Sequence, residues 1–198
     1  MGRGRTNETP GTAFPPAGLA AGAGLPAGAG LPAQRLVEAL LHRRRTMAAA
    51  ESCTAGMVAD LVARIPGASR VLWGSFVTYM VDAKVKALGL DPGELRKFGP
   101  VSRETACAMA LGALDRSGAD YAVAVTGLAG PGGDGSGVPV GTVWIATVDR
   151  ERVPAAREFH FEGARNEIRE RAARESLEAL LKRILLGESD RNEVSSPV

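Results

Sequence analysis

Hydrophobic and polar positions follow two different periods along the chain, and the alternation of these periods predicts an α/β fold. Apolar and β-branched runs that are typical of strands occur at 46–50, 71–79, 121–126, 140–148 and 155–161. Apolar residues at helical spacing occur at 33–45, 54–64, 81–88, 91–98, from 102 onward, and at 164–186.

The order of these segments predicts a three-layer α/β/α sandwich around a mixed, mostly parallel five-stranded sheet. Parallel strands that follow one another would be joined by right-handed crossovers. The last two strands are separated only by the charged turn at 149–152, so we expect them to form an antiparallel hairpin. A single domain at 34–186 accounts for the whole pattern.

The two ends of the chain lack this pattern. Residues 1–33 are rich in Gly, Ala and Pro, and the hexad AGAGLP occurs at 21–26 and again at 27–32. Such a sequence buries too little apolar surface to offset its ordering entropy, so we predict a disordered tail. The alternative is a signal peptide with Arg3 and Arg5 as its basic start, but Gly and Pro interrupt the apolar centre that it requires. Residues 187–198 are polar and are expected to fray.

Composition narrows the class of protein. Hydrophobic residues make up 45% and charged residues 23% of the 198 residues, and no apolar run approaches the ~20 residues of a membrane helix. Cys53 and Cys107 cannot form a disulfide framework, so we expect a cytoplasmic protein without a membrane partner. The two histidines, His42 and His160, form no metal-ligand spacing. With a net charge of +2, we interpret the arginines at 43–45 as a solvated helix end, the alternative being nucleic-acid contact.

The segment AAAESCTAG at 48–56 carries the main candidate site. Small apolar residues give way to a polar cluster and helical spacing follows, which indicates a buried strand, a sharp turn and a helix start. Ser52 would lie at the carboxyl end of the strand, beside free backbone N–H groups able to hold an oxyanion. The alternative is that Ser52 or Thr54 only caps the helix. Cys53 is either a rival nucleophile or a small buried hydrophobe, and Glu51 is either a general base or a partner of the helix-start N–H groups.

A serine nucleophile needs a base, and neither histidine lies near a turn motif that would complete a Ser-His-Asp triad. Lys84 and Lys86 follow the second predicted strand, together with Tyr79. A lysine with a lowered pKa, or a tyrosine that relays a proton, can activate serine in place of histidine. The alternatives are a solvated helix face for Lys84 and an amphipathic strand end for Tyr79.

Two further features suit an anionic or nucleotide ligand. The segment 127–141 contains seven glycines, including Gly127 and Gly130, whose backbone would allow close approach to a phosphate. It lacks the Lys-Ser/Thr pair of a P-loop, so a flexible surface loop is the alternative. Arg165 and Arg169 lie one turn apart and could clamp a phosphate or carboxylate, or could instead pair with neighbouring glutamates.

Taken together, these residues resemble the nicotinamide-nucleotide amidase family, the C-terminal domain of competence/damage-inducible protein CinA. The resemblance extends from about Leu36 to Leu185. It is carried by short segments in the right order, namely AESCTAG at 50–56, GSFVTY at 74–79, AK at 83–84, PVS at 100–102, AVTGLAGP at 124–131, PVGTVW at 139–144 and the segment 161–169.

The resemblance implies hydrolysis of the carboxamide of nicotinamide mononucleotide to nicotinic acid mononucleotide and ammonia, without metal or cofactor. Ser52 would be the nucleophile, Lys84 with Tyr79 would move the proton, and Thr126 would lie beside them. Substrate would be held by the turn after Ser52, by the glycine loop and by an arginine. The residues implied in binding are Glu51, Cys53, Thr54, Ala55, Gly56, Gly127, Gly130, Arg165 and Arg169. We also expect a homo-oligomer.

The chain departs from the usual family pattern at three places near these residues. Ala55 stands where the family usually has Gly, Met80 and Val81 stand where it usually has Ser-Asn, and Ala164 replaces a usual Asp. A site that loses hydrogen-bonding groups can lose activity on its usual substrate. A second hypothesis is therefore a non-catalytic nucleotide-binding module linked to competence or recombination.

Overall fold

The computed structural model describes residues 31–194, with side chains described for 31–186. The predicted N-terminal tail lies outside this range except for its last three residues, which form the first turn of α1 (Leu31–Arg43). At the other end, α6 (Arg165–Val194) continues past the helix end predicted at 186, so the polar segment begins as helix. None of the described helices is long and apolar enough to cross a membrane.

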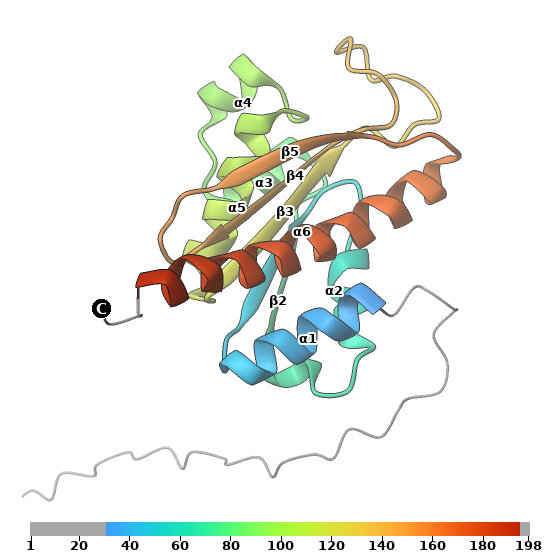
Figure 1. The fold of residues 1–198 in the computed structure, drawn as a ribbon. Helices are drawn as coiled ribbons and strands as arrows, with labels where there is room; N and C mark the ends of the chain where they lie inside the picture. The colour runs from blue at the N-terminus through green and yellow to red at the C-terminus, as the bar shows by residue number, and fades with distance from the viewer. Residues whose placement is uncertain (1–30, 195–198) are drawn as a thin grey trace, which may run out of the picture.

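A single five-stranded sheet with the strand order β2-β1-β3-β4-β5 forms the middle of the molecule (Figure 1). β1 pairs in parallel with β2 and β3, whereas β4 is antiparallel to both β3 and β5. The mixed sheet and the terminal hairpin are therefore as predicted. The strands are β1 (Met47–Glu51), β2 (Leu72–Val77), β3 (Tyr121–Gly127), β4 (Thr142–Asp149) and β5 (Ala155–His160).

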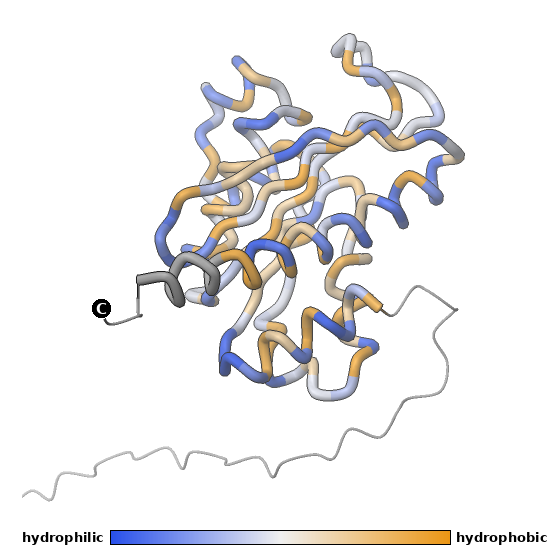
Figure 2. The backbone as a smooth tube through the Cα atoms, viewed as in Figure 1, coloured by the Kyte–Doolittle hydropathy of each residue, from blue (hydrophilic) through white to orange (hydrophobic). Residues whose placement is uncertain are grey.

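Helices cover both faces of the sheet and give the predicted three layers. One face packs against α1, α2 (Met57–Ala63) and α6, and the other packs against α5 (Arg103–Ser117), which α3 (Val81–Leu88) and α4 (Pro92–Phe98) flank. Each face has its own apolar core. Hydrophobic segments run through the central strands, and hydrophilic segments lie mostly on the outer turns (Figure 2).

The interior strand β1, which lies between β2 and β3, determines where the polar residues after it point. All five of its residues are buried, which small alanines allow because both faces are covered. Successive side chains in a strand point to opposite faces. Ala49 lies in the core beneath α1, α2 and α6, and Ala50 lies in the core beneath α5. The polar residues that continue this alternation are therefore divided between two different sides of the sheet.

The turn after β1 differs from the prediction in one respect. The expected helix at 54–64 begins only at Met57, because Ala55 and Gly56 have left-handed backbone with φ of 52° and 100°. Neither residue can continue a right-handed helix in this conformation. Three residues that had been expected in the helix, 54–56, thus form a turn that sets the direction of the chain between Ser52 and α2.

Candidate active site

The hydroxyl of Ser52 lies against the amine of Lys84. The Nζ atom of Lys84 is 2.8 Å from Oγ of Ser52, and it also donates a hydrogen bond of 2.7 Å to the carbonyl of Thr78. Ser52 follows β1 at its carboxyl end, and Lys84 lies in α3, which begins just beyond the end of the neighbouring strand β2. The two predicted residues are therefore in direct contact, and neither Ser52 nor Thr54 caps α2.

Lys84 is buried, with 1% of its surface exposed, so the solvated helix face considered from the sequence is wrong. Burial disfavours the charged amine and lowers the pKa of Lys84 from 10.5 to about 8. No carboxylate of the described residues pairs with this amine to offset the effect, since its two hydrogen-bond partners there are a hydroxyl and a carbonyl. A sizeable fraction of Lys84 is consequently neutral near pH 8, and a neutral amine can accept the serine proton.

Thr126 lies on the same side of the sheet as Ser52. Its neighbours Ala122 and Ala124 point into the α5 core, and strand alternation directs Thr126 the same way. The backbone N–H of Ser52 donates to the carbonyl of Val125, which places β1 and β3 side by side at this end. The Thr126 hydroxyl donates to the carbonyl of Pro100 over 2.7 Å. Thr126 thus ties the segment before α5 to the end of the sheet next to Ser52.

Glu51 lies on the opposite side and has a structural role. Its carboxylate is fully buried and accepts five hydrogen bonds of 2.8–3.1 Å, three of them from backbone N–H groups at the start of α2. The predicted free N–H groups of α2 are therefore occupied, which corrects the expectation that they face a ligand. Of the two roles left open for Glu51, the structure gives the pairing with the helix start. The donors are Thr54, Ser75, Gly56, Val58 and Ala59.

Cys53 is a buried hydrophobe in this structure. Its side chain lies in the core beneath α1, α2 and α6. Burial raises the pKa of the Cys53 thiol to about 11. Since the thiolate is the nucleophilic form, a thiol that stays protonated at neutral pH is a poor rival to Ser52.

Tyr79 and Arg165 meet at the rim of the site, where two loops come together. The guanidinium of Arg165 donates to the hydroxyl of Tyr79 over 2.6 Å, and it also donates to the carbonyl of Gly130. This contact joins the start of α6 to the loop after β2 and to the glycine loop. The partner of the Tyr79 hydroxyl is thus Arg165, and only Lys84 of the two predicted proton carriers reaches Ser52. Within the described part of the chain, Arg165 pairs with none of the three glutamates that were the alternative, Glu162, Glu167 and Glu170.

The glycine loop approaches its surroundings closely at two positions. A Cβ on Gly127 would lie 2.7 Å from the carbonyl oxygen of Thr142, and one on Gly130 would lie 2.7 Å from the side chain of Val140. Gly130 also has a φ of 76°, which favours glycine. The loop is therefore held against β4 at its base, and it passes the Arg165–Tyr79 contact at Gly130.

Arg169 contacts the turn after Ser52. Its Nε donates to the carbonyl of Cys53 over 2.9 Å, one Nη donates to the carbonyl of Thr54 over 3.1 Å, and the other donates to Asn166 over 3.0 Å. The N–H of Ala55 bonds back to the carbonyl of Ser52. Among the described residues, the N–H groups of Cys53 and Thr54 are the two in this turn without a backbone or carboxylate acceptor.

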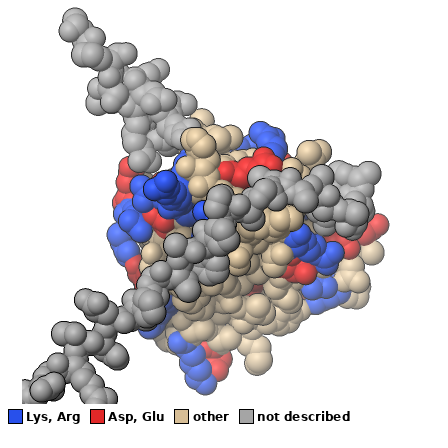
Figure 3. Space-filling model, turned by 90° about the horizontal axis from the view of Figure 1, so that it is seen from below, with Lys and Arg blue, Asp and Glu red and all other residues tan. Residues whose placement is uncertain are grey.

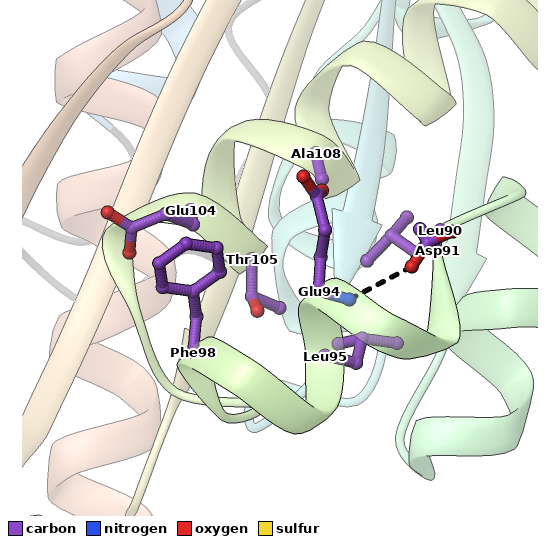
Figure 4. Close-up of a pocket in the computed structure, with 8 residues that line it drawn as sticks. All are labelled: Leu90, Asp91, Glu94, Leu95, Phe98, Glu104, Thr105 and Ala108. Carbon is purple, nitrogen blue, oxygen red and sulfur yellow. Dashed lines mark hydrogen bonds between the residues drawn. The ribbon is translucent and has the colours of Figure 1, made fainter.

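Two other surface features are separate from this site. A shallow pocket between α4 and α5 contains none of the predicted site residues, and Asp91 in it caps α4 (Figure 4). On the face seen in Figure 3, basic and acidic side chains are interspersed, and Arg45 pairs with Asp120 at 2.7 Å.

In the described part of the chain, no group of three or more His, Cys, Asp or Glu residues could hold a metal ion.

The sequence did not predict the backbone groups that hold the side chains of the site. The Thr78 carbonyl that receives Lys84, and the Pro100 carbonyl that receives Thr126, carry no side-chain signal. Ser75 donates to Glu51 over 2.8 Å and belongs to the segment 74–79, so its place in a recognised motif was the available signal.

Comparison with known proteins finds relatives that are described as competence-damage inducible proteins. The chain is 42% identical over 150 residues to a putative competence-damage inducible protein of Caldicellulosiruptor saccharolyticus, covering 76% of this chain and 36% of that protein. It is 46% identical over 159 residues to a protein of the same description from Symbiobacterium thermophilum, covering 76% and 37%. The chain therefore spans about a third of the length of these relatives.

Solved structures agree with the sequence matches. The crystal structure of a competence/damage inducible protein from Agrobacterium tumefaciens superposes with a TM-score of 0.75 at 42% identity, covering 78% of this chain and 94% of that one. A CinA superfamily protein from Klebsiella pneumoniae superposes with a TM-score of 0.77 at 29% identity, covering 80% and 98%. The family model described as the CinA C-terminal domain matches residues 31–184. With its fold, its sequence and its relatives in agreement, this chain belongs to the CinA C-terminal domain family.

Proposed function

We propose that this protein is a serine-dependent amidase that converts nicotinamide mononucleotide to nicotinic acid mononucleotide and ammonia. The observation that carries the proposal is the 2.8 Å contact between Oγ of Ser52 and the buried amine of Lys84. An amine whose pKa is lowered to about 8 can exchange protons with substrate near neutral pH. A chain that only bound nucleotides would have no need for a buried lysine in direct contact with a serine hydroxyl at the end of the sheet.

In the proposed reaction, neutral Lys84 takes the proton of Ser52 as Oγ attacks the carboxamide carbon. The carbonyl π electrons move to oxygen, and the N–H groups of Cys53 and Thr54 hold the resulting oxyanion. Protonated Lys84 then gives its proton to the amide nitrogen, the C–N bond breaks and ammonia leaves. Water then attacks the remaining ester while Lys84 takes its proton. The C–Oγ bond breaks, Lys84 gives that proton to Oγ, and the acid is released with Ser52 and neutral Lys84 restored.

Arg165 is the residue that we assign to the phosphate of the substrate. It is exposed at the rim, and it already joins Tyr79 to the carbonyl of Gly130. Each Nη of Arg165 uses one donor in these contacts, and its Nε has no acceptor among the described residues. The guanidinium therefore keeps donors, including Nε and an adjacent Nη, with which it can contact a phosphate. In this proposal Tyr79 acts by holding the Arg165 side chain in place, since its hydroxyl is bonded to Arg165 and not to Ser52.

Ammonia release from nicotinamide mononucleotide by the purified protein tests this proposal. We expect turnover by the wild type and none by Ser52→Ala, with Ser117→Ala as the matched control. The Ser117 hydroxyl bonds to the carbonyl of Ala113 within α5 and has no part in the reaction. Equal release by wild type and Ser52→Ala, or no release by the wild type, would reject the proposal.

A second function, nucleotide binding without turnover, is favoured by one observation. Met80 and Val81 are 71% and 47% exposed at the start of α3, where an apolar surface offers a substrate no hydrogen bonds. Calorimetry distinguishes the two functions, because a binding module would give heat of binding with the mononucleotide while the ammonia assay stayed blank.

A further inference from the structure

Arg169 binds the turn after Ser52 with the Nε–Nη edge of its guanidinium, the edge that could otherwise form a bidentate contact with an anion. Nε and one Nη donate to the consecutive carbonyls of Cys53 and Thr54, and the other Nη donates to Asn166. A bidentate contact with phosphate needs two adjacent donors of the same fork. The Nε edge is taken by backbone, and one donor of the remaining edge is taken by Asn166.

Because the peptide group is planar, these contacts to the carbonyls also determine where the neighbouring N–H groups point. In a trans peptide the C=O and the following N–H point in opposite directions. Holding the Cys53 carbonyl toward Arg169 therefore directs the N–H of Thr54 away from it. In the same way, the bond from Ala55 N–H to the Ser52 carbonyl directs the N–H of Cys53 outward. These two N–H groups, which have no backbone or carboxylate acceptor among the described residues, are thus the ones whose peptide carbonyls are anchored.

The turn requires such an anchor because of its backbone. Ala55 and Gly56 are both left-handed, with φ of 52° and 100°, and an alanine is strained in this region. Within the turn, the groups that donate to the Glu51 carboxylate are the Thr54 hydroxyl and the Gly56 N–H. Glu51 therefore fixes the end of the turn that is nearer to α2. The Thr54 carbonyl also accepts from the N–H of Met57, whereas among the described residues the Cys53 carbonyl is bonded by the Arg169 guanidinium alone.

We propose that Arg169 is a positioning residue that holds the Cys53 and Thr54 N–H groups in place for the oxyanion, and that it is not a ligand of the substrate phosphate. This inference rests on the proposed amidase function. It also divides the predicted arginine pair, since it leaves phosphate recognition to Arg165.

Kinetics with two substrates separates the two roles. Nicotinamide riboside has the same carboxamide as the mononucleotide and lacks the phosphate. For Arg169→Gln we expect kcat to fall about 100-fold with both substrates, as misplaced catalytic groups cause, while KM for the mononucleotide stays near the wild-type value. The ratio of kcat/KM for the two substrates then remains unchanged, and this ratio does not depend on the fraction of folded enzyme.

The matched control is Arg171→Gln, at an arginine on the same helix as Arg169. It removes a guanidinium contact to the carbonyl of Glu162, which precedes the helix, and it is expected to leave both rates unchanged. Arg169→Lys can keep one carbonyl contact, so its kcat should lie between those of the wild type and Arg169→Gln. A raised KM for the mononucleotide alone, with the riboside unaffected, would show a phosphate ligand and overturn the inference.

The rate of amide hydrogen exchange tests the positioning role of Arg169 independently of catalysis. Loss of a hydrogen bond to a charged group should speed exchange of the Ala55 N–H about tenfold or more in Arg169→Gln, and not in Arg171→Gln. Unchanged exchange would overturn the positioning role even if the amidase were active. Faster exchange in a protein without amidase activity would instead mean that the proposed function failed while the turn is anchored as described.

Discussion

The buried amine of Lys84 makes a prediction about stability that holds whatever the substrate is. Lys84→Met removes the titrating group and keeps most of the side-chain volume. The pKa of Lys84 falls from its ordinary value of 10.5 to about 8 in the folded protein. At about 1.4 kcal/mol for each pH unit, this difference corresponds to about 3 kcal/mol in the free energy of unfolding.

The sign follows from where the protons are bound. Below pH 8 the amine is protonated in both states, and the folded protein carries the full cost of a buried charge. Between pH 8 and 10.5 the unfolded state binds more protons, so the stability of the wild type rises with pH. Above 10.5 both states are neutral and the rise is complete. Stability relative to Lys84→Met should therefore increase by about 3 kcal/mol across this window.

Urea unfolding of both proteins at a series of pH values, followed by circular dichroism, measures this difference. Subtracting the variant from the wild type cancels groups that titrate alike in the two proteins. A difference that stays flat between pH 7 and 10.5, or that falls, would refute the assignment of a neutral buried amine. In the amidase assay the same group should make kcat/KM rise with pH and level off above about 8, because only neutral Lys84 can accept the serine proton.

Three further predictions concern the turn after β1. Glu51→Gln should lower the free energy of unfolding by about 2–4 kcal/mol in urea titration, because an amide NH2 would face some of the five donors; unchanged stability would contradict the structural role. Ala55→Gly should raise stability by about 1 kcal/mol, seen as a higher melting temperature, by relieving the left-handed alanine; a lower melting temperature would count against this strain. Cys53→Ala should keep the rate of ammonia release, and iodoacetamide should label Cys107 before the buried Cys53; loss of activity would restore the thiol as a candidate nucleophile.

The sequence by itself determined the elements and the type of sheet, because those follow from local periodicity and from the order of segments. The helix at 81–88 was predicted with the bounds that the structure shows. The starts predicted at 91 and 102 coincide with Asp91 and Ser102, whose side chains cap α4 and α5. Ser52 was a candidate because an apolar run ends there. In these cases the signal lies within a few residues of the feature that it predicts.

Only the tertiary structure decided what each candidate does. The partners lie far apart along the chain: Lys84 follows Ser52 by 32 residues, and Arg169 follows Cys53 by 116. Strand alternation and the crossover through α3 bring Lys84 to Ser52. Glu51, the residue before Ser52, points to the other face of the sheet, where its carboxylate binds the N–H groups at the start of α2. Burial then lowers the pKa of the lysine. A residue's chemistry depends on its neighbours and on its distance from water, and the fold sets both.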